Sequence, residues 1–309
     1  MKLVHKSIFF GLFLTTFFVS CDNNEVIPEK ETQQTNGSLS GTGSFQFNEF
    51  ALIQNNPLTV YYHIPENSSS TSDVLIVFHG AARDAKENRD ALIAKANEKG
   101  ILLIVPEFSQ ASFPGGDAYN LGNIFEDGDN PSSSTLNPEE QWTFSIVEPL
   151  FDYFKLLSGN NSATYNVFGF SAGAQVAHRF AFFKPAARFN LLVAASSGWY
   201  TIPDNAIDFP YGIKKSPLEN SNLASLFAKN IFIVIGEADN NPNEGGLRRN
   251  SIVDLQGTNR YARAQYFFNQ SNAIATGNNQ SFNWQYKSLP NVGHNVVLTA
   301  NYAFDSIFN

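Results

Sequence analysis

Residues 165–180 read YNVFGFSAGAQVAHRF, which is a short apolar run, a Gly-x-Ser-x-Gly turn and then a helical pattern. This order of strand, sharp turn and helix is the context in which such a turn presents a nucleophile. Gly169 and Gly173 flank Ser171, and a serine held on a strained turn needs small neighbours to avoid steric clash. The Ser171 hydroxyl would lie at a helix N-terminus, where unpaired N–H groups favour developing negative charge. We therefore predict a nucleophilic serine; the alternative is a glycine-rich turn whose serine caps the helix.

Strand and helix patterns alternate on both sides of this motif. Continuous apolar runs predict strands buried on both faces at 74–78, 101–105, 189–195 and 231–235. Helical spacing is found at 84–98, 141–157 and 259–269. Alternating apolar residues predict edge strands at 45–62 and 284–289. This order predicts one α/β domain built on a mostly parallel sheet.

A serine hydroxyl needs a neighbouring base, and the base needs an acid that fixes its tautomer. His294 is the only histidine far beyond Ser171, and it stands in a Gly-His turn after the last predicted strand. His178 follows Ser171 by about two helical turns and cannot face its hydroxyl, so we interpret it as structural. His79 is interpreted as structural, supporting the loop after Phe78 by hydrogen bonding, and neither His5 nor His63 is expected to serve as the base.

The acid is expected where the strand predicted at 231–235 ends. Asp239 completes a Gly-x-x-Asp pattern there, while Glu237 and Asp254 are weaker candidates. Asp239 is alternatively a turn cap, because Asp-Asn-Asn-Pro suits a turn. The loop half-matches a calcium-binding pattern, but Glu244 replaces the required glycine. We therefore expect no metal and no cofactor.

With Ser171, Asp239 and His294 in this order, the chain resembles the α/β-hydrolase superfamily. The resemblance extends from about Leu58 to the C-terminus, and it is nearest to secreted esterases of the polyhydroxybutyrate-depolymerase-like and feruloyl-esterase-like kind. It implies an α/β-hydrolase fold, with a mostly parallel central sheet flanked by helices. It also implies that these three residues form a catalytic triad.

Acyl transfer further needs N–H donors for an oxyanion. The resemblance implies the backbone N–H of Ala172 as one donor and an N–H from the loop after Phe78 as the other. Ala81 is the predicted second donor, and Ala82 is its close alternative. Many esterases of these subfamilies carry a cysteine after His-Gly and several disulfides, whereas this chain has Ala81 and no second cysteine. Their substrates therefore do not carry over.

Residues 107–139 form a long polar segment that leaves the carboxyl end of a predicted strand. Such loops bind ligands in open α/β sheets, so we predict that it faces the substrate; the alternative is a surface excursion. Four aromatic side chains are candidates for lining a substrate pocket, with plain core packing as the alternative: Trp199, Tyr200, Phe170 and Tyr119.

The N-terminus carries an export pattern. Lys2 and Lys6 form a positive region before the apolar run Ile8 to Val19, which is too short for a comfortable membrane span. The run ends at Ser20-Cys21, which resembles a bacterial lipobox, and Cys21 is the only cysteine of the chain. We predict a signal peptide over 1–21 with lipidation at Cys21, a flexible polar tether over 22–43 and the catalytic domain over 44–309. The alternative is an ordinary signal peptide with a chance cysteine.

The formal net charge of −8, with no cluster of lysine and arginine, argues against a nucleic-acid partner. Together these features predict an exported serine hydrolase, anchored by lipid to the periplasmic or surface face of a bacterial membrane. The expected substrate is a small-molecule or polymeric carboxylic ester, cleaved through an acyl-enzyme. A serine peptidase and a non-catalytic binding lipoprotein on a hydrolase scaffold remain the alternatives.

Overall fold

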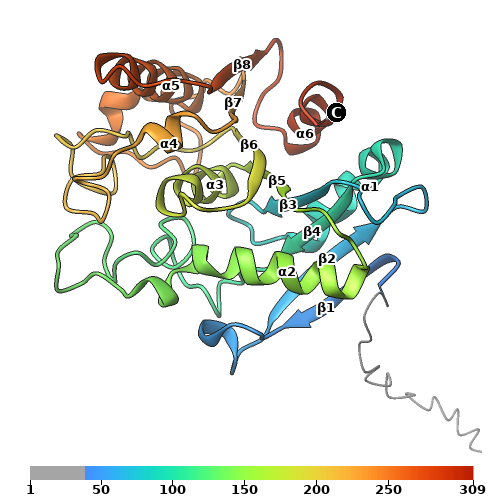
Figure 1. The fold of residues 1–309 in the computed structure, drawn as a ribbon. Helices are drawn as coiled ribbons and strands as arrows, with labels where there is room; N and C mark the ends of the chain where they lie inside the picture. Colours follow the sequence, from blue (N-terminus) through green and yellow to red (C-terminus); the bar gives the residue numbers. More distant parts are fainter. Residues whose placement is uncertain (1–38, 309) are drawn as a thin grey trace, which may run out of the picture. The chain divides into compact units, whose positions relative to one another are not determined.

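The computed structural model describes residues 39–308, and the predictions for the signal peptide, Cys21 and most of the tether lie outside the described residues. Eight described strands form one sheet in the order β1-β2-β4-β3-β5-β6-β7-β8 (Figure 1). Their bounds are β1 Gly41–Phe47, β2 Leu58–Ile64, β3 Val74–Phe78, β4 Leu102–Pro106, β5 Tyr165–Phe170, β6 Phe189–Ala195, β7 Ile231–Gly236 and β8 Gln285–Leu289. β2 runs antiparallel to both of its neighbours, and all other strand pairs are parallel. β1 begins at Gly41, inside the segment predicted as tether.

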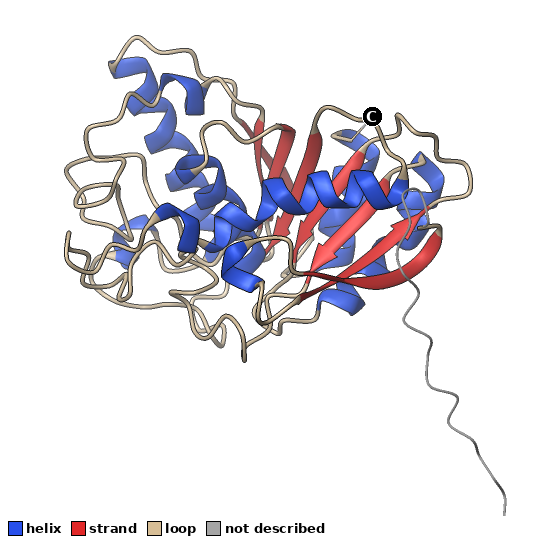
Figure 2. Cartoon of the chain, turned by 60° about the horizontal axis from the view of Figure 1, so that its bottom comes forward, coloured by secondary structure: helices blue, strands red, loops and turns tan. Residues whose placement is uncertain are grey.

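Helices cover both faces of this sheet (Figure 2). They are α1 Ala85–Lys99, α2 Val147–Ser158, α3 Ala172–Phe183, α4 Ala224–Phe227, α5 Arg260–Gly277 and α6 Val296–Ser306. α1 and α6 share a core with one face, and α2, α3 and α5 share the core of the other face. Strands β3, β4, β5 and β7 are buried along their whole length, as their continuous apolar runs predict. The predicted fold is confirmed.

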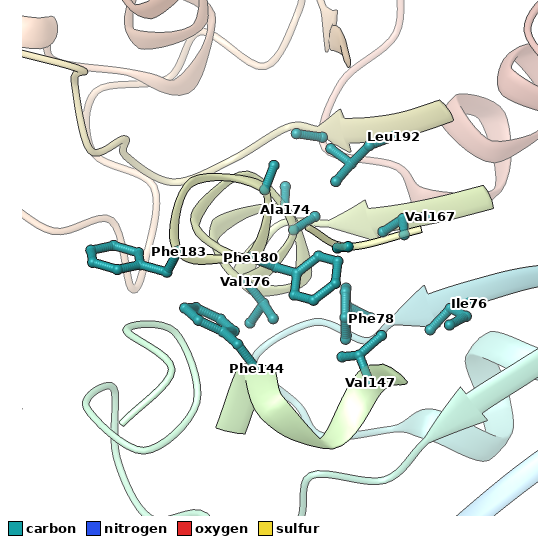
Figure 3. Close-up of a cluster of buried hydrophobic side chains, with 14 of the residues drawn as sticks. Ile76, Phe78, Phe144, Val147, Val167, Ala174, Val176, Phe180, Phe183 and Leu192 are labelled. Carbon is teal, nitrogen blue, oxygen red and sulfur yellow. The ribbon is translucent and has the colours of Figure 1, made fainter. Parts of the chain in front are cut away.

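Helix α3 follows the Gly-x-Ser-x-Gly turn and is buried on every side. Figure 3 shows its Val176 and Phe180 side chains among Phe78 of β3 and Phe144. The Phe180 ring lies edge-on to both phenylalanines, with ring centroids 6.2 Å apart in each case. A helix that is buried all round is held by its surroundings in every direction. The first residue of α3, and the turn before it, are therefore fixed in position.

Two helix predictions were wrong at their ends. The helix expected over 141–157 begins only at Val147, after two 3₁₀ turns at Glu139–Gln141 and Thr143–Ile146. Pro149 accounts for the late start, because a proline is tolerated in the first turn of a helix and not in its interior. The helix expected over 259–269 runs on to Gly277.

The 107–139 segment is packed and hydrogen-bonded, although it contains no helix or strand. The Arg83 guanidinium donates to the carbonyls of Phe113 and Gly115 at 3.2 and 3.0 Å, and also to that of Phe108. The Tyr119 hydroxyl donates to the carbonyl of His79 at 2.7 Å. The segment is thus fastened to the loop that follows β3. Figure 1 shows it, in green, on the same side as the yellow loop that follows β6 and the orange loop that follows β7.

Candidate active site

Ser171 stands between β5 and α3 in a strained backbone conformation, with φ 57° and ψ −114°. The two glycines of the motif are required by contacts that any side chain would make. A Cβ at Gly169 would lie 2.2 Å from the carbonyl oxygen of Gly173, and a Cβ at Gly173 would lie 1.9 Å from that of Phe78. The Ser171 N–H donates to the carbonyl of Ala195 at 2.9 Å, which ties the turn to β6.

The structure brings Ser171, His294 and Asp239 together from three separate loops. His294 Nε2 lies 3.1 Å from Ser171 Oγ, and His294 Nδ1 lies 2.7 Å from Asp239 Oδ2. The Asp239 side chain is 4% exposed and that of His294 is 26% exposed, so the acid is buried while the base reaches solvent. With Nδ1–H donating to the carboxylate, Nε2 is free to accept the serine proton. This arrangement can activate a hydroxyl nucleophile.

The loops that carry Asp239 and His294 are fastened to each other. The Ala238 N–H donates to the carbonyl of Val292 at 2.9 Å, and the Glu237 N–H donates to that of Leu289 at 3.0 Å. Gly236 ends β7 at this contact, and a Cβ there would lie 2.1 Å from the Val292 oxygen. The absence of a side chain at Gly236 therefore lets the two loops approach closely.

The N-terminus of α5 supports Asp239 from the other side. The Tyr261 N–H donates to the Asp239 carbonyl at 3.1 Å, and Asn259 caps the helix by accepting from Ala262 N–H at 2.9 Å. Arg260, the first residue of α5, places Nη1 3.3 Å from Asp239 Oδ1, and both side chains are buried. The carboxylate thus has one oxygen facing His294 and the other facing Arg260.

Neither of the weaker acid candidates contacts His294. Glu237 accepts the Ser288 hydroxyl at 2.8 Å. Asp254 lies in a 3₁₀ turn and pairs with Arg249 at 2.8 Å and with Arg263 at 3.2 Å. The Arg249 guanidinium lowers the pKa of the Asp254 carboxyl. Asp254 therefore belongs to a surface ion-pair group.

His178 and His79 occupy the buried positions expected of structural histidines. His178 contacts the Ala174 carbonyl at 2.9 Å through Nδ1 and accepts the Thr201 N–H at 3.1 Å through Nε2. His79 Nε2 accepts the Phe108 N–H at 3.0 Å. Burial holds the pKa of His178 well below its usual value and lowers the pKa of His79 to about 4. Both rings are neutral hydrogen-bonding parts of the scaffold.

A cavity of about 470 Å³ opens over Ser171 and His294. Ala172 and Ala81, the predicted oxyanion donors, both line it. Ala172 is the first residue of α3, so its N–H is one of those that a helix leaves unpaired. The 107–139 segment also borders the cavity, through Gly116, Asp117, Asn120, Leu121 and Asp129. The cavity therefore lies where the sequence predicts a substrate-facing loop.

The four predicted aromatic residues have different positions. Trp199 lines the cavity, and the Phe170 ring packs against the His294 ring with centroids 4.6 Å apart. Tyr200 is fully buried and stacks on Phe267 at 4.3 Å, and Tyr119 is fully buried beneath His79. Tyr119 and Tyr200 are core residues, and their burial does not fit a role in contacting the substrate.

Sequence reasoning missed three polar residues of the cavity wall, namely Gln175, Arg248 and Arg260. Arg248 lies over the Trp199 ring at 4.9 Å, and the buried Arg179 lies over the same ring at 4.1 Å. These residues come from α3, α5 and the loop after β7, so no local spacing connects them. Only the fold brings them to one place.

No group of three or more histidine, cysteine or acidic side chains in residues 39–308 is placed to hold a metal ion. None of the helices described here is both long enough and apolar enough to cross a membrane.

No protein-family model and no curated protein sequence matches the chain. Among solved structures, poly(aspartic acid) hydrolase-1 from Sphingomonas sp. KT-1 is 36% identical, with a TM-score of 0.81, over 87% of this chain and 99% of that chain. The poly(3-hydroxybutyrate) depolymerase LpqC from Bordetella parapertussis is 26% identical, with a TM-score of 0.80, over 86% of this chain and 89% of that chain. An S-formylglutathione hydrolase from Agrobacterium tumefaciens shares the fold, at 14% identity and a TM-score of 0.52, over 89% of this chain and 96% of that chain.

The first of these relatives is similar to this chain in sequence as well as in fold, over nearly its whole length. The sheet order and the flanking helices agree with that similarity. The chain therefore belongs to the α/β-hydrolase superfamily of serine-hydrolase and esterase-like enzymes.

Proposed function

We propose that this hydrolase cleaves carboxylic esters through a catalytic triad of Ser171, His294 and Asp239. The observation that carries the proposal is the continuous line of contacts from Asp239 Oδ2 through the His294 ring to Ser171 Oγ, ending in a cavity. The relative at 26% identity is a poly(3-hydroxybutyrate) depolymerase, and its polyester substrate supports an ester as the substrate of this chain, either a small molecule or a polymer.

In this mechanism Ser171 Oγ attacks the acyl carbonyl while His294 Nε2 takes the serine proton. The N–H groups of Ala172 and Ala81 stabilise the oxyanion that forms. His294 then gives the proton to the leaving alcohol, and the acyl group stays on Ser171. A water molecule, deprotonated by His294, attacks the acyl-enzyme and releases the acid. Asp239 keeps the imidazole oriented and stabilises its charged form throughout.

Amide hydrolysis is the second candidate, because the same triad cleaves amides. It is favoured by the relative at 36% identity, which is a poly(aspartic acid) hydrolase, since poly(aspartic acid) is linked by amide bonds. Both functions need the same Ser171 nucleophile, so only turnover can separate them.

The test is a hydrolysis screen of short and long acyl esters, feruloyl esters, acetylated sugars, peptides and poly(aspartic acid), run on the wild type and on Ser171→Ala. We expect ester turnover that Ser171→Ala abolishes. A fluorophosphonate probe should label the wild type alone, with circular dichroism confirming that the variant folds. Turnover of amides without esters would replace the first function by the second. Labelling that survives Ser171→Ala would place the nucleophile elsewhere.

We also propose that the enzyme is exported and anchored by lipid at Cys21. The proposal is supported by the lipobox-like sequence and by the position of the only cysteine. In a bacterial host fed labelled fatty acid, the wild type should incorporate label and fractionate with membranes, and Cys21→Ala should do neither. An unlabelled wild type would refute the anchor and leave the triad unaffected.

A further inference from the structure

Arg260 occupies an unusual place in the catalytic cavity. It is the first residue of α5, it lines the cavity that opens over Ser171, and it is only 7% exposed. Long cationic side chains are seldom buried to this extent without a full set of partners.

The set of hydrogen-bond and ion-pair partners of Arg260 is incomplete among the described residues. Asp239 is the only acidic side chain of residues 39–308 within ion-pair distance of Arg260, and the contact is a single one of 3.3 Å from Nη1. Arg260 Nε is buried and has no hydrogen-bond partner in this part of the protein. A guanidinium has five N–H donors in a planar fork, and a buried donor without an acceptor is costly. The Arg260 guanidinium therefore has more hydrogen-bond donors than the described residues around it have acceptors for.

Asp239 alone does not explain the position of this guanidinium. Its other oxygen already accepts from His294, and a cation beside the carboxylate weakens the stabilisation that Asp239 gives to a protonated His294. Because Arg260 also lines the cavity, an anion bound there would accept from its guanidinium and offset its charge next to Asp239. A carboxylate fits best, since its two oxygens match the guanidinium fork.

We propose that Arg260 is a specificity-determining residue that binds a carboxylate carried by the substrate close to the scissile bond. Arg260 and Ser171 line the same cavity, and they are connected through Asp239 and His294 by contacts of 3.3, 2.7 and 3.1 Å. The inference rests on the proposed function and narrows its substrates to anionic esters or amides.

The other charged residues of the cavity wall limit the binding of an anion to the side where Arg260 lies. Asp117, Asp129 and Glu244 also border the cavity, and none of them pairs with Arg260. The other arginine of the wall, Arg248, already pairs with Asp129 and lies over the Trp199 ring. Arg249, the next residue along the chain, pairs with Asp254 and does not line the cavity, so it provides the control for losing a cation outside the cavity wall.

The test compares two pairs of esters that differ by a carboxylate in place of a methyl group. One pair is monomethyl succinate and methyl butyrate; the other is the butyrate esters of 4-hydroxybenzoate and 4-methylphenol. We expect the wild type to favour the charged member of at least one pair in kcat/KM. Arg260→Gln should lower that preference about 10-fold or more, the effect of losing a hydrogen bond to a charged group. Arg260→Lys should retain part of it, and Arg249→Gln should leave the ratio unchanged.

For any one variant, the ratio of kcat/KM between the charged and the uncharged ester does not depend on how much of the protein is folded. If Arg260 only held Asp239 in place, Arg260→Gln would lower turnover of both members equally, and that result would overturn the proposal. So would a wild type without a carboxylate preference in either pair. Glutarate competition against fluorophosphonate labelling of Ser171 tests the anion site even if no ester is cleaved: protection should occur in the wild type and disappear in Arg260→Gln. Absence of all ester turnover would count against the ester function instead.

Discussion

At the scale of single residues, the Asp239 carboxylate determines which way the catalytic histidine faces. Its Oδ2 lies 2.7 Å from His294 Nδ1, and the side chain is 4% exposed, so water does not compete for this contact. A carboxylate offers only acceptors, which requires Nδ1 to carry the proton and leaves Nε2 free for Ser171. The tautomer of His294 thus follows from the chemistry of one neighbour.

Asp239→Asn tests this assignment. The asparagine keeps the shape of the side chain but can present an N–H where an acceptor is needed, which favours the wrong tautomer. The comparable substitution in a serine protease costs about 10⁴-fold in turnover, so we expect kcat on the best ester to fall by about 10²-fold or more. The measurement is steady-state turnover of purified wild type and variant.

Asp254→Asn is the control for that experiment. Asp254 pairs with Arg249 and Arg263 in a turn that does not touch His294, so its substitution should change kcat little. A variant Asp239→Asn with near-normal turnover, beside an inactive Asp254→Asn, would move the acid to Asp254. Ser171 and His294 would keep their proposed roles.

At the scale of elements, the site depends on the close approach of the turn after β7 to the loop after β8. Gly236→Ala places a Cβ 2.1 Å from the Val292 carbonyl oxygen, a backbone atom that cannot rotate away. We expect a loss of about 1–3 kcal/mol in unfolding free energy, as in overpacked cores. Since misplacing catalytic groups by about 1 Å can cost about 10²-fold, kcat should fall at least 10-fold. Denaturant unfolding and ester turnover measure the two effects.

Gly277→Ala is the matched control, because an added Cβ at Gly277 meets nothing within 4 Å. Gly277 ends α5, far along the chain from the catalytic loops, and alanine is the better helix former. This variant should keep full turnover and wild-type or higher stability. Equal losses in the two variants would show that glycine substitution in general, and not the contact with Val292, is harmful.

The elements show which parts of the site were predictable. The Gly-x-Ser-x-Gly turn, the buried strands and the ends of β7 and β8 are local patterns, and they placed Ser171, Asp239 and His294 at one edge of the sheet. Arg260 and Arg248 were not predictable, because their importance comes from packing between α5, the loop after β7 and the 107–139 segment. Tyr119 and Tyr200 take the core alternative, because an aromatic residue near a site has the same sequence signature as one in the core.

At the scale of the whole molecule, two neutral histidines are built into the core. The burial that holds their pKa values low applies only in the folded protein; in the unfolded chain His79 returns toward the ordinary value of 6.5. Well above pH 6.5 both histidines are neutral in the folded and in the unfolded protein, so pH has no effect on stability through these groups. As the pH falls below 6.5, the histidines bind protons in the unfolded state but not in the folded state. The folded state therefore loses stability until the pH reaches the pKa of the histidine in the folded protein.

The unfolding free energy should therefore fall between pH 7 and pH 5, by about 2 kcal/mol from His79 alone given its folded pKa of about 4, with His178 adding in the same direction. The Asp254 carboxyl, whose pKa is lowered by Arg249, titrates below this window and does not obscure it. Urea unfolding at both pH values measures the slope in the wild type and in His79→Gln. The variant loses an acceptor for the Phe108 N–H and should be less stable at pH 7, yet its stability should depend less on pH because the titrating group is gone. Parallel pH dependences in the two proteins would mean that the His79 ring takes up a proton in the folded state as readily as in the unfolded chain.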